Sequence, residues 1–361
     1  MGKGPAPRVH AVILAGGAGE RFWPASRARR PKPFLQIGDG RTLLAATLSR
    51  ARRFAGHDAI WVVCGADHAE AIRRSTRLPA RRILVEPVRR NTAMAIAMAT
   101  AWIAREEPEA VIAVLPADHC IPDERAFARA IGRAARAAAG AGALVTLGVR
   151  PTRPDTGYGY IQVGALAGRA WPGLRRVRRF VEKPDAARAR RYLRGGGHLW
   201  NAGIFVFGAG TLLRELESCA PAVHRAVAPL LRARRRPTAR MLARCYRSAP
   251  ALPIDVAVME RSRAVWTLPV AFHWSDVGTW SSLADELGVA PGATRIVGGE
   301  LLFDERGGNL VWGRRSVALL GIDGVAVIDA GDVLLVTKLE RSPDVRRIVA
   351  ALKARGRTDV L

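Results

Sequence analysis

Three glycines and two basic residues near the N-terminus form the first group that could do chemistry. The segment VILAGGAGERFWPASRARRPKPFL runs from residue 12 to residue 35, and its chemistry-bearing residues are Gly16, Gly17, Gly19, Arg21 and Lys32. Glycines after a strand let the backbone approach a ligand and leave amide groups free to bind phosphate oxygens. Cations this near such a turn can neutralise a triphosphate and the charge that develops when it is attacked. The segment therefore predicts phosphate chemistry, although a plain turn followed by solvated surface charges has the same sequence pattern.

Two common nucleotide-binding motifs do not match this segment. The dinucleotide fingerprint G-x-G-x-x-G requires a third glycine where this chain has Phe22. Asp39 stands at about the right distance for a ribose contact, but it lies in the predicted turn IGDGRT and not at the end of a second strand. The P-loop pattern GxxxxGK[ST] does not occur in the sequence. Both the dinucleotide-binding and the P-loop interpretations are therefore disfavoured.

A sheet would bring this segment together with later polar motifs. Through the first half of the chain, short apolar runs alternate with helical patterns, which is typical of βαβ units in a mainly parallel sheet with helices on both faces. The predicted strands are residues 9–14, 59–64, 82–86, 110–115 and 143–147. The motif GGAGER follows the first of them, EPVRRNTA the third and LPADH the fourth. Because ligands lie at the carboxyl ends of such strands, all three motifs are candidates for one binding site.

The second half of the chain changes character twice. Mixed structure is expected first, with strands at residues 157–163, 177–184 and 200–207 and helices at 186–194 and within 211–246. From residue 288, short apolar segments separated by Gly or Asp predict a small all-β appendage. A last amphipathic helix is expected at residues 344–354. We therefore predict two domains, residues 1–287 and residues 288–361.

The composition is strongly basic. The 361-residue chain has a formal net charge of +26, which would suit a nucleic-acid partner. The surplus is nearly all arginine, extends from end to end and accompanies a heavy use of alanine, so a compositional bias explains it better than a binding face does. The runs at residues 27–30 and 232–236 are the places where a nucleic-acid interaction remains an alternative.

The sequence shows no pattern typical of a membrane span, a signal peptide or a disulfide framework. The longest apolar stretches, residues 93–104 and 137–149, are shorter than the roughly 20 residues of a membrane span, and no signal peptide is expected. The cysteines are scattered and form no CxxC pair, so we expect free thiols in the cytoplasm, without a zinc site or disulfides. They are Cys64, Cys120, Cys219 and Cys245.

Eight motifs in order resemble one enzyme family. The glycine segment resembles the signature of the sugar-1-phosphate nucleotidylyltransferases, and in particular of the bacterial mannose-1-phosphate guanylyltransferases. The resemblance continues through EPVRRNTAMAIA, VLPADHCI, RPDTGYGYI, FVEKPD, LWNAGIFVF, PIDVAVMER and WSDVGTWSSL. It covers roughly residues 9–335. It implies a Rossmann-like, GT-A-like mixed sheet, and a short β-helix is one form that the appendage could take.

The resemblance also implies the reaction and its residues. GMP would be transferred from GTP to α-D-mannose 1-phosphate, giving GDP-mannose and pyrophosphate. Arg21 and Lys32 would stabilise the transition state, and Asp118 and Asp276 would bind Mg²⁺, which prefers one or two carboxylates plus phosphate oxygens and water. The implied nucleotide-binding residues are Leu14, Ala15, Gly16, Gly17, Gly19, Glu20, Arg21, Glu86, Arg90, Asn91, Thr92 and Asp118. The implied sugar-phosphate-binding residues are Gly157, Tyr158, Glu182, Lys183 and Asn201.

Structural interpretations of several of these residues stay open at this point. Asp118 also fits the N-cap of a helix that begins near IPDERAF, and Asp276 fits the N-cap of a helix in VGTWSSLADEL. Asn91 and Thr92 likewise fit caps of a helix over residues 93–105. Three departures from the family pattern bear on loop shape and substrate preference and remove no charged group. They are Pro33, Met94 and Val256.

Alternative functions also stay open. The chain could use another sugar 1-phosphate, such as a heptose phosphate, or another nucleotide. A non-catalytic sensor of nucleotide sugars would have the same fold, but the presence of Arg21, Lys32, Asp118 and Asp276 argues against it. The expected partners are GTP and mannose 1-phosphate, without nucleic acid or membrane, and the appendage is a candidate surface for a homodimer.

Overall fold

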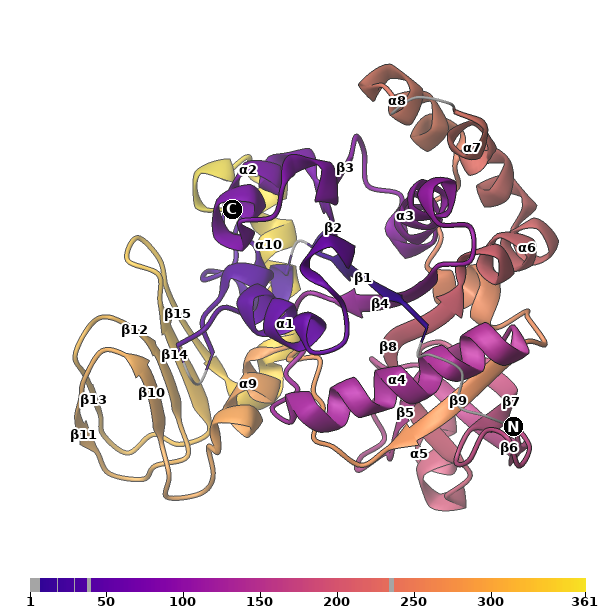
Figure 1. Cartoon of the computed structure of the whole chain (residues 1–361). Helices are drawn as coiled ribbons and strands as arrows, with labels where there is room; N and C mark the ends of the chain where they lie inside the picture. The colour runs from indigo at the N-terminus through magenta and orange to yellow at the C-terminus, as the bar shows by residue number, and fades with distance from the viewer. Residues whose placement is uncertain (1–6, 18, 29, 38–39, 234–236) are drawn as a thin grey trace. The chain divides into compact units, whose positions relative to one another are not determined.

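The computed structural model describes residues 7–17, 19–28, 30–37, 40–233 and 237–361 (Figure 1). By its internal contacts the chain divides into two compact units, which are described separately below. Unit 1 comprises Met1–Gly16, Thr47–Pro116 and Ile121–Trp274, and unit 2 comprises Gly17–Ala46, Ala117–Cys120 and Ser275–Leu361. The domain boundary expected after residue 287 stays a prediction, although α9 ends there, at Leu287, and the strands beyond it form sheets of their own.

Unit 1 is built on one mixed sheet of nine strands in the order β3-β2-β1-β4-β8-β5-β9-β7-β6. The strands β3, β2, β1 and β4 pair in parallel with one another, whereas β8 runs antiparallel to both β4 and β5. Their bounds are β1 Val9–Leu14, β2 Ile60–Gly65, β3 Ile83–Glu86, β4 Val111–Pro116, β5 Leu144–Val149, β6 Tyr160–Leu166, β7 Arg175–Val181, β8 His198–Gly208 and β9 Val265–Val270. The strands β1, β2 and β4 are apolar runs, interrupted in β1 by His10, and are buried almost throughout, as expected of parallel strands covered on both faces. The predicted mixed α/β fold is confirmed.

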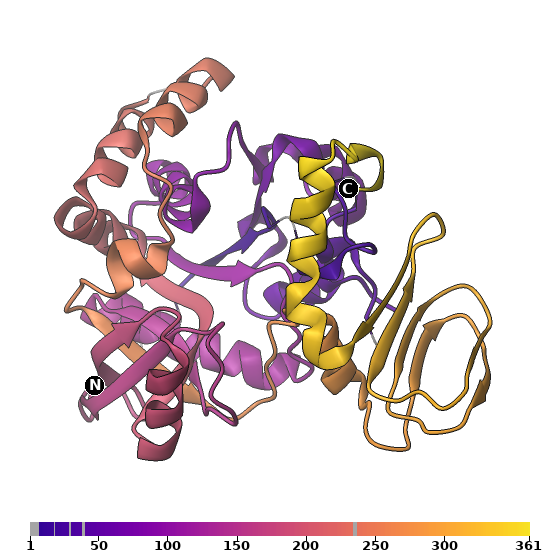
Figure 2. The same ribbon diagram turned by 180° about the vertical axis from the view of Figure 1, so that it is seen from behind.

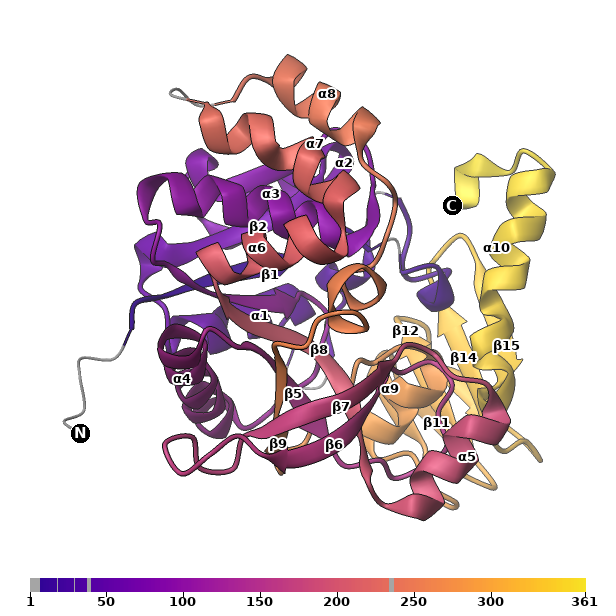
Figure 3. The ribbon, with the colours of Figure 1, turned by 90° about the vertical axis from the view of Figure 1, so that its right-hand side faces the viewer.

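Helices cover both faces of this sheet. The helix α3 packs against α6 and α7, and α4 packs against β4, β5 and β8 (Figure 3). The bounds are α2 Ala66–Thr76, α3 Asn91–Glu106, α4 Glu124–Ala141, α5 Ala186–Gly195, α6 Ala209–Cys219, α7 Pro221–Arg232 and α8 Ala239–Ser248, with a π-helical turn at Asp255–Met259. Residues 93–103 of α3 are all buried, which explains why this helix is apolar around its whole circumference. Met94, one of the three departures from the family pattern, is thus a core side chain.

Unit 2 contains the glycine segment from Gly17 onward and the C-terminal strands. Its strands are β10 Arg295–Gly298, β11 Leu301–Asp304, β12 Leu310–Gly313, β13 Val317–Leu319, β14 Val325–Asp329 and β15 Leu334–Lys338. They form the sheets β10-β12-β14-β15 and β11-β13, in which only β14 and β15 pair antiparallel. From β10 to β14, successive strands therefore alternate between two parallel sheets, which is the winding that a short β-helix requires. The helices are α9 Trp280–Leu287 and α10 Val345–Ala354, and α10 is the long yellow helix in Figure 2.

One apolar core joins the glycine segment to these strands and helices. Two short 3₁₀ turns, η1 Glu20–Phe22 and η2 Lys32–Phe34, position the segment. The ring of Phe22 lies 4.8 Å from that of Trp280 on α9, and both side chains are fully buried. The same core includes Leu310, Ile328 and Val345 from β12, β14 and α10. Packing within unit 2 thus fixes the segment that carries Arg21 and Lys32, and α1 Leu43–Arg52 follows it.

The predicted elements differ from the structure in a few places. The stretch 211–246, expected to be helical, is divided among α6, α7 and α8, and Pro221 begins α7, where a proline is well tolerated. The strands β9 and β10 were not predicted. The β9 sequence VWTLPV contains Pro269, which normally argues against a strand. Here β7 pairs with β9 only at Trp266 and Thr267. Pro269, which has no backbone N–H to donate, therefore lies beyond the part of β9 that pairs with β7. No helix in the described ranges has the length and apolar character needed to cross a membrane.

Candidate functional site

A cavity of about 460 Å³ in unit 2 collects the charged residues predicted for phosphate and metal. Three short segments of unit 2 supply them: the glycine segment, residues 117–120 and the chain just before α9. Arg346 of α10 completes the lining. The lining residues are Gly19, Glu20, Arg21, Phe22, Lys32, Asp118, Asp276, Gly278 and Arg346. The structure thus brings together both predicted catalytic cations and both predicted metal-binding aspartates, although they are up to 255 positions apart in the sequence.

Lys32 is the central contact of this cavity. Its Nζ donates hydrogen bonds to Asp118 Oδ2 at 2.8 Å and to the backbone carbonyl of Asp276 at 2.7 Å. The lysine is 7% exposed, whereas the Asp118 side chain is 32% exposed at the cavity wall. Burial by itself would raise the pKa of Asp118, but the charges of Lys32 and His119 and the hydrogen bond from Lys32 together lower that pKa below its ordinary value. Asp118 is therefore ionised at neutral pH, as a metal ligand must be.

The glycines of the segment have different roles. Gly19 has a φ of +64°, and a Cβ there would lie 2.5 Å from the Cβ of Lys32, so only glycine lets the chain pass this close to the lysine. A Cβ at Gly17 would meet no described atom within 4 Å, so its backbone borders open space. Gly16, in unit 1, lies against the carboxylate of Glu86, since a Cβ there would be 3.3 Å from Glu86 Oε2.

Capping does not explain the two aspartates. The helix α4 is capped by Asp123, whose side chain accepts a hydrogen bond from the Ala126 amide, so the N-cap interpretation of Asp118 is wrong. The helix α9 is capped by Thr279, which accepts from the Ser282 amide, so the N-cap interpretation of Asp276 is wrong as well. Helix capping therefore accounts for neither aspartate.

The donor set fits Mg²⁺ that arrives with a phosphorylated substrate. Asp118 and Asp276 line one cavity beside two arginines, and the hydrogen bond from Lys32 occupies only one oxygen of Asp118. In the described ranges, no group of three or more His, Cys, Asp or Glu side chains is placed to hold a metal ion. Two carboxylates without a third protein ligand suit a cation that takes its other ligands from phosphate oxygens and water.

The residue after Asp276 is strained. Val277 is fully buried and has a φ of +43°, a genuine outlier for a β-branched residue. Among the described residues, the other non-glycine positions with positive φ are Arg77, at the end of α2, and Asn91 and Lys183. Three of these four thus lie in or beside predicted site motifs. Such strain costs roughly 1 to 3 kcal/mol and tends to accumulate at functional sites.

Two residues of α10 belong to this cavity or its edge, and the sequence did not indicate them. Arg346 adds a third cation to the lining. The neighbouring Glu20, which was predicted to bind nucleotide, accepts a hydrogen bond from Lys353 Nζ at 2.5 Å. The only sequence signal in this helix is its amphipathic pattern, which shows that one face is polar but not what that face contacts.

Unit 1 holds the predicted residues for the base. Leu14 and Ala15 lie at the end of β1, where the Ala15 amide donates to the Val63 carbonyl at 2.8 Å. Glu86 ends β3 and is buried, and its Oε1 has no hydrogen-bond partner among the described residues. Burial raises the pKa of Glu86 to about 7, while the Tyr246 hydroxyl and Arg89 favour the charged form and limit the increase. A buried acceptor without a partner is expected where a ligand supplies the donor.

The neighbouring residues of EPVRRNTA mainly hold unit 1 together. The Arg90 Nε donates to the Tyr246 carbonyl at 3.0 Å, and Thr92 Oγ1 accepts from the Ile254 amide at 2.8 Å. The expected capping of α3 by Asn91 and Thr92 is wrong: Arg90 is the N-cap residue and makes no side-chain cap hydrogen bond, while Asn91 Oδ1 accepts from the adjacent Thr92 amide. Asn91 is exposed, so its side chain can reach a ligand.

The predicted sugar residues surround a carboxyl that the sequence did not single out. Asn201 is buried; its Oδ1 accepts from Thr146 Oγ1 at 2.8 Å and from the Gly203 amide at 3.1 Å. Its Nδ2 donates to Asp255 Oδ1 at 2.9 Å. Burial and, next, the charge of Glu182 raise the pKa of Asp255 to about 7. The motif PIDVAVMER contained this aspartate, but the raised pKa depends on the burial that the π-helical turn produces.

The other sugar candidates lie close by. Glu182 Oε1 accepts from Lys183 Nζ at 2.7 Å, and the lysine is 59% exposed while the glutamate is 15% exposed. Tyr158 packs edge-on against Trp200 and Trp274, with ring centroids 4.9 and 5.2 Å away, so its ring is a packing element. The Gly157 amide donates to Asp155 Oδ1 at 2.8 Å.

Comparison with known proteins gives consistent matches. A model of the nucleotidyl transferase family matches residues 10–288. The chain is 38% identical over 354 residues to xanthan biosynthesis protein XanB of Xanthomonas campestris pv. campestris, covering 96% of this chain and 74% of that protein. It is 35% identical over 362 residues to mannose-1-phosphate guanylyltransferase RfbM of Salmonella typhimurium, covering 96% and 73%. A crystal structure of mannose-1-phosphate geranyltransferase from Thermus thermophilus matches with a TM-score of 0.87 and 36% identity, covering 96% of this chain and 99% of that one.

Proposed function

The chain belongs to the nucleotidyl transferase family, and we propose that it transfers GMP from GTP to α-D-mannose 1-phosphate, releasing pyrophosphate and forming GDP-mannose. The observation that carries this proposal is the cavity in which Lys32 joins Asp118 to Asp276 beside Arg21. The name of the Salmonella relative supports the choice of mannose 1-phosphate and of a guanine nucleotide.

The reaction needs charge neutralisation more than proton transfer. A phosphate oxygen of the sugar phosphate attacks the α-phosphorus of GTP, and the bond to the β-phosphate oxygen breaks as pyrophosphate leaves. Because that nucleophile is already ionised at neutral pH, no general base is assigned. Arg21, Lys32 and Arg346 line the cavity as fixed cations, and we propose that they neutralise the triphosphate and the charge that develops on it.

Lys32 also has a positioning role. Since its Nζ is held by Asp118 and by the Asp276 backbone, it keeps one carboxylate ionised and fixes the strained turn that carries the other. Asp118 and Asp276 would hold Mg²⁺, which when bound supplies Lewis-acid polarisation of phosphate oxygens. The hydrogen bonds of Lys32 orient these ligands before substrate binds, which lowers the reorganisation needed during the reaction.

We propose that the polar groups of unit 1 recognise the base and the sugar. Glu86 would accept hydrogen bonds from the N–H donors of guanine, which would satisfy its Oε1 and favour its charged form. Asn201 and Glu182 would bind sugar hydroxyls, because the contacts with Thr146 and Asp255 fix the Asn201 amide in one orientation. Lys183, exposed beside Glu182, would meet the sugar's phosphate.

Free thiols and exposed apolar side chains bear on location and assembly. We propose a cytoplasmic enzyme, because Cys64, Cys120, Cys219 and Cys245 are all free thiols. We also propose a homodimer through the C-terminal strands, where Leu302, Phe303 and Leu320 are more than half exposed.

Pyrophosphate release tests the proposed function. We would assay the full chain against GTP and other nucleoside triphosphates, each with mannose 1-phosphate and other sugar 1-phosphates, with and without Mg²⁺. We expect the highest kcat/KM with GTP and mannose 1-phosphate and no turnover without a divalent cation. Turnover with GTP but only another sugar phosphate would overturn the substrate, and no turnover in any combination would overturn the enzyme assignment.

A further inference from the structure

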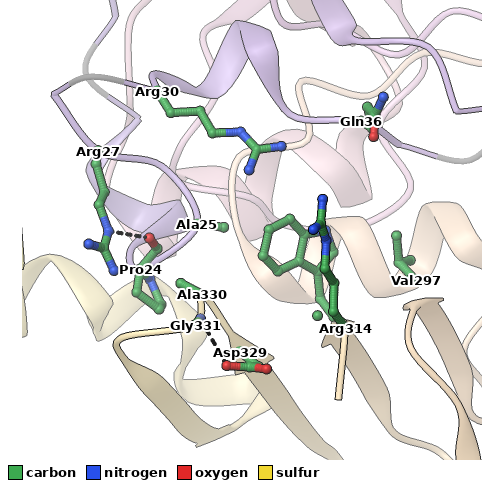
Figure 4. A pocket seen from close by; sticks show the side chains of 13 residues that line it. Pro24, Ala25, Arg27, Arg30, Gln36, Val297, Arg314, Asp329, Ala330 and Gly331 are labelled. Atoms are coloured by element: carbon green, nitrogen blue, oxygen red, sulfur yellow. Dashed lines mark hydrogen bonds between the residues drawn. The ribbon is translucent and has the colours of Figure 1, made fainter. Parts of the chain in front are cut away.

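A second cavity, of about 510 Å³, lies in unit 2 and shares no lining residue with the cavity around Lys32. Its walls come from the end of the glycine segment and from β10, β12 and β14. The lining residues are Pro24, Ala25, Arg27, Arg30, Gln36, Val297, Gly298, Trp312, Gly313, Arg314, Asp329, Ala330 and Gly331 (Figure 4). The volume is within the range of roughly 300 to 1,000 Å³ that is typical of small-molecule sites.

Two charged residues that line this cavity, Arg27 and Asp329, are each paired with an opposite charge. Arg27 donates to both carboxylate oxygens of Asp332, at 2.7 and 2.6 Å, and to the Pro24 carbonyl at 2.9 Å. Asp329 accepts from the Gly331 amide at 2.9 Å and forms an ion pair with Arg315 at 3.2 Å. These contacts tie the glycine segment to the turn after β14 and make the cavity a built feature of unit 2.

The other two cations point into the cavity. Arg30 and Arg314 extend from different segments toward the same space (Figure 4). Within the described ranges, no carboxylate forms an ion pair with either guanidinium. With Arg27 and Asp329 balanced by their own partners, the described lining carries an excess of two positive charges. Guanidinium groups bind phosphate in a bidentate geometry, so this pair suits an anion with more than one phosphate.

An aromatic ring completes the site. Trp312 lines the cavity, is half-buried, and packs on the core through Trp280, with ring centroids 6.0 Å apart. Stacking of a nucleobase on such a ring contributes about 1 to 3 kcal/mol and does not depend on which base is bound. An aromatic ring beside two phosphate-binding cations matches the two halves of a nucleotide.

We propose that this cavity is a second ligand site that binds a nucleoside diphosphate or triphosphate, with the phosphates on Arg30 and Arg314 and the base on Trp312. The cavity is a single compartment of one-ligand size, which favours a small molecule over a nucleic acid. The site does not depend on the proposed reaction, because its residues are separate from those of the Lys32 cavity.

Equilibrium dialysis of the full chain with GTP and Mg²⁺, without sugar phosphate, tests the proposal. We expect two GTP molecules per chain for the wild type and one for Arg314→Glu and for Trp312→Leu, with second-site binding at least about 10-fold weaker in each variant. Arg355→Glu, an exposed charge reversal at the end of α10, is the matched control and should retain two. ATP should bind the second site within about 10-fold of GTP, since stacking does not discriminate between bases.

Several outcomes would overturn the second site. One GTP per chain in the wild type that both variants retained would do so, and so would two per chain in both variants. If inorganic pyrophosphate bound the second site as tightly as GTP, the base contact with Trp312 would be excluded and the nucleotide assignment would be wrong. Pyrophosphate release in the absence of excess nucleotide should stay within about 2-fold of wild type for Arg314→Glu, which shows that the variant folds and keeps the proposed function separate from this test.

Discussion

Replacing Asp255 by Asn should change how stability depends on pH. Burial and the charge of Glu182 raise the pKa of this carboxyl from its ordinary 3.8 to about 7. Between those two values the folded protein keeps a proton that the unfolded chain has lost, so the free energy of unfolding falls as pH rises through that window and stays low above it. Since one pKa unit corresponds to about 1.4 kcal/mol, the destabilisation above pH 7 is at most about 4 kcal/mol.

The side chain of Asp255 is only half-buried, so we expect about half of that ceiling, roughly 2 kcal/mol. Asn has the same shape and can still accept the hydrogen bond from Asn201 Nδ2, but it cannot ionise. Asp255→Asn should therefore be more stable than wild type by roughly 2 kcal/mol at pH 8 and equal to it at pH 4.

Urea-induced unfolding at pH 4, 5.5, 7 and 8, followed by circular dichroism, measures this difference. The exposed Asp323 is the matched control, because Asp323→Asn removes one charge without changing a buried group. If Asp255→Asn paralleled wild type at every pH, or gained stability only at pH 4, the inferred burial of the charge would be refuted.

Three further predictions separate structural from functional roles. Asp118→Ala should lower kcat for pyrophosphate release by at least about 100-fold. Asp123→Ala removes the cap of α4, so it should lower the free energy of unfolding by about 1 kcal/mol and leave kcat near wild type. Similar kcat values for the two variants would remove Asp118 from the site. Gly19→Ala should destabilise the protein by more than about 1 kcal/mol in thermal unfolding, whereas Gly17→Ala should fold normally and raise KM for GTP. A larger loss of stability in Gly17→Ala than in Gly19→Ala would contradict the geometry. Glu86→Gln should lower the preference for GTP over ATP in kcat/KM by about 10-fold or more, and an unchanged preference would exclude the base contact.

Much of the fold could be predicted because its strands have strong local signals. The strands β1 to β5 are short apolar runs buried on both faces, and each was predicted within two residues of its bounds. The strand β9 was missed because Pro269 contradicts the usual strand pattern, and only its place beside β7 and β5 makes the proline acceptable. Which strands lie beside β9 depends on the tertiary fold and cannot be read from the sequence of β9 itself.

The residue types of the candidate site follow from the sequence alone: glycines that permit close approach, cations for phosphate and aspartates at the ends of predicted elements. Which of them act together depends on the fold, because packing within unit 2 places Lys32 between Asp118 and Asp276 and brings Arg346 to the same cavity. The raised pKa values of Glu86 and Asp255 also depend on the fold. Desolvation and electrostatic attraction act over a few ångströms of space, and those distances are set when the core forms.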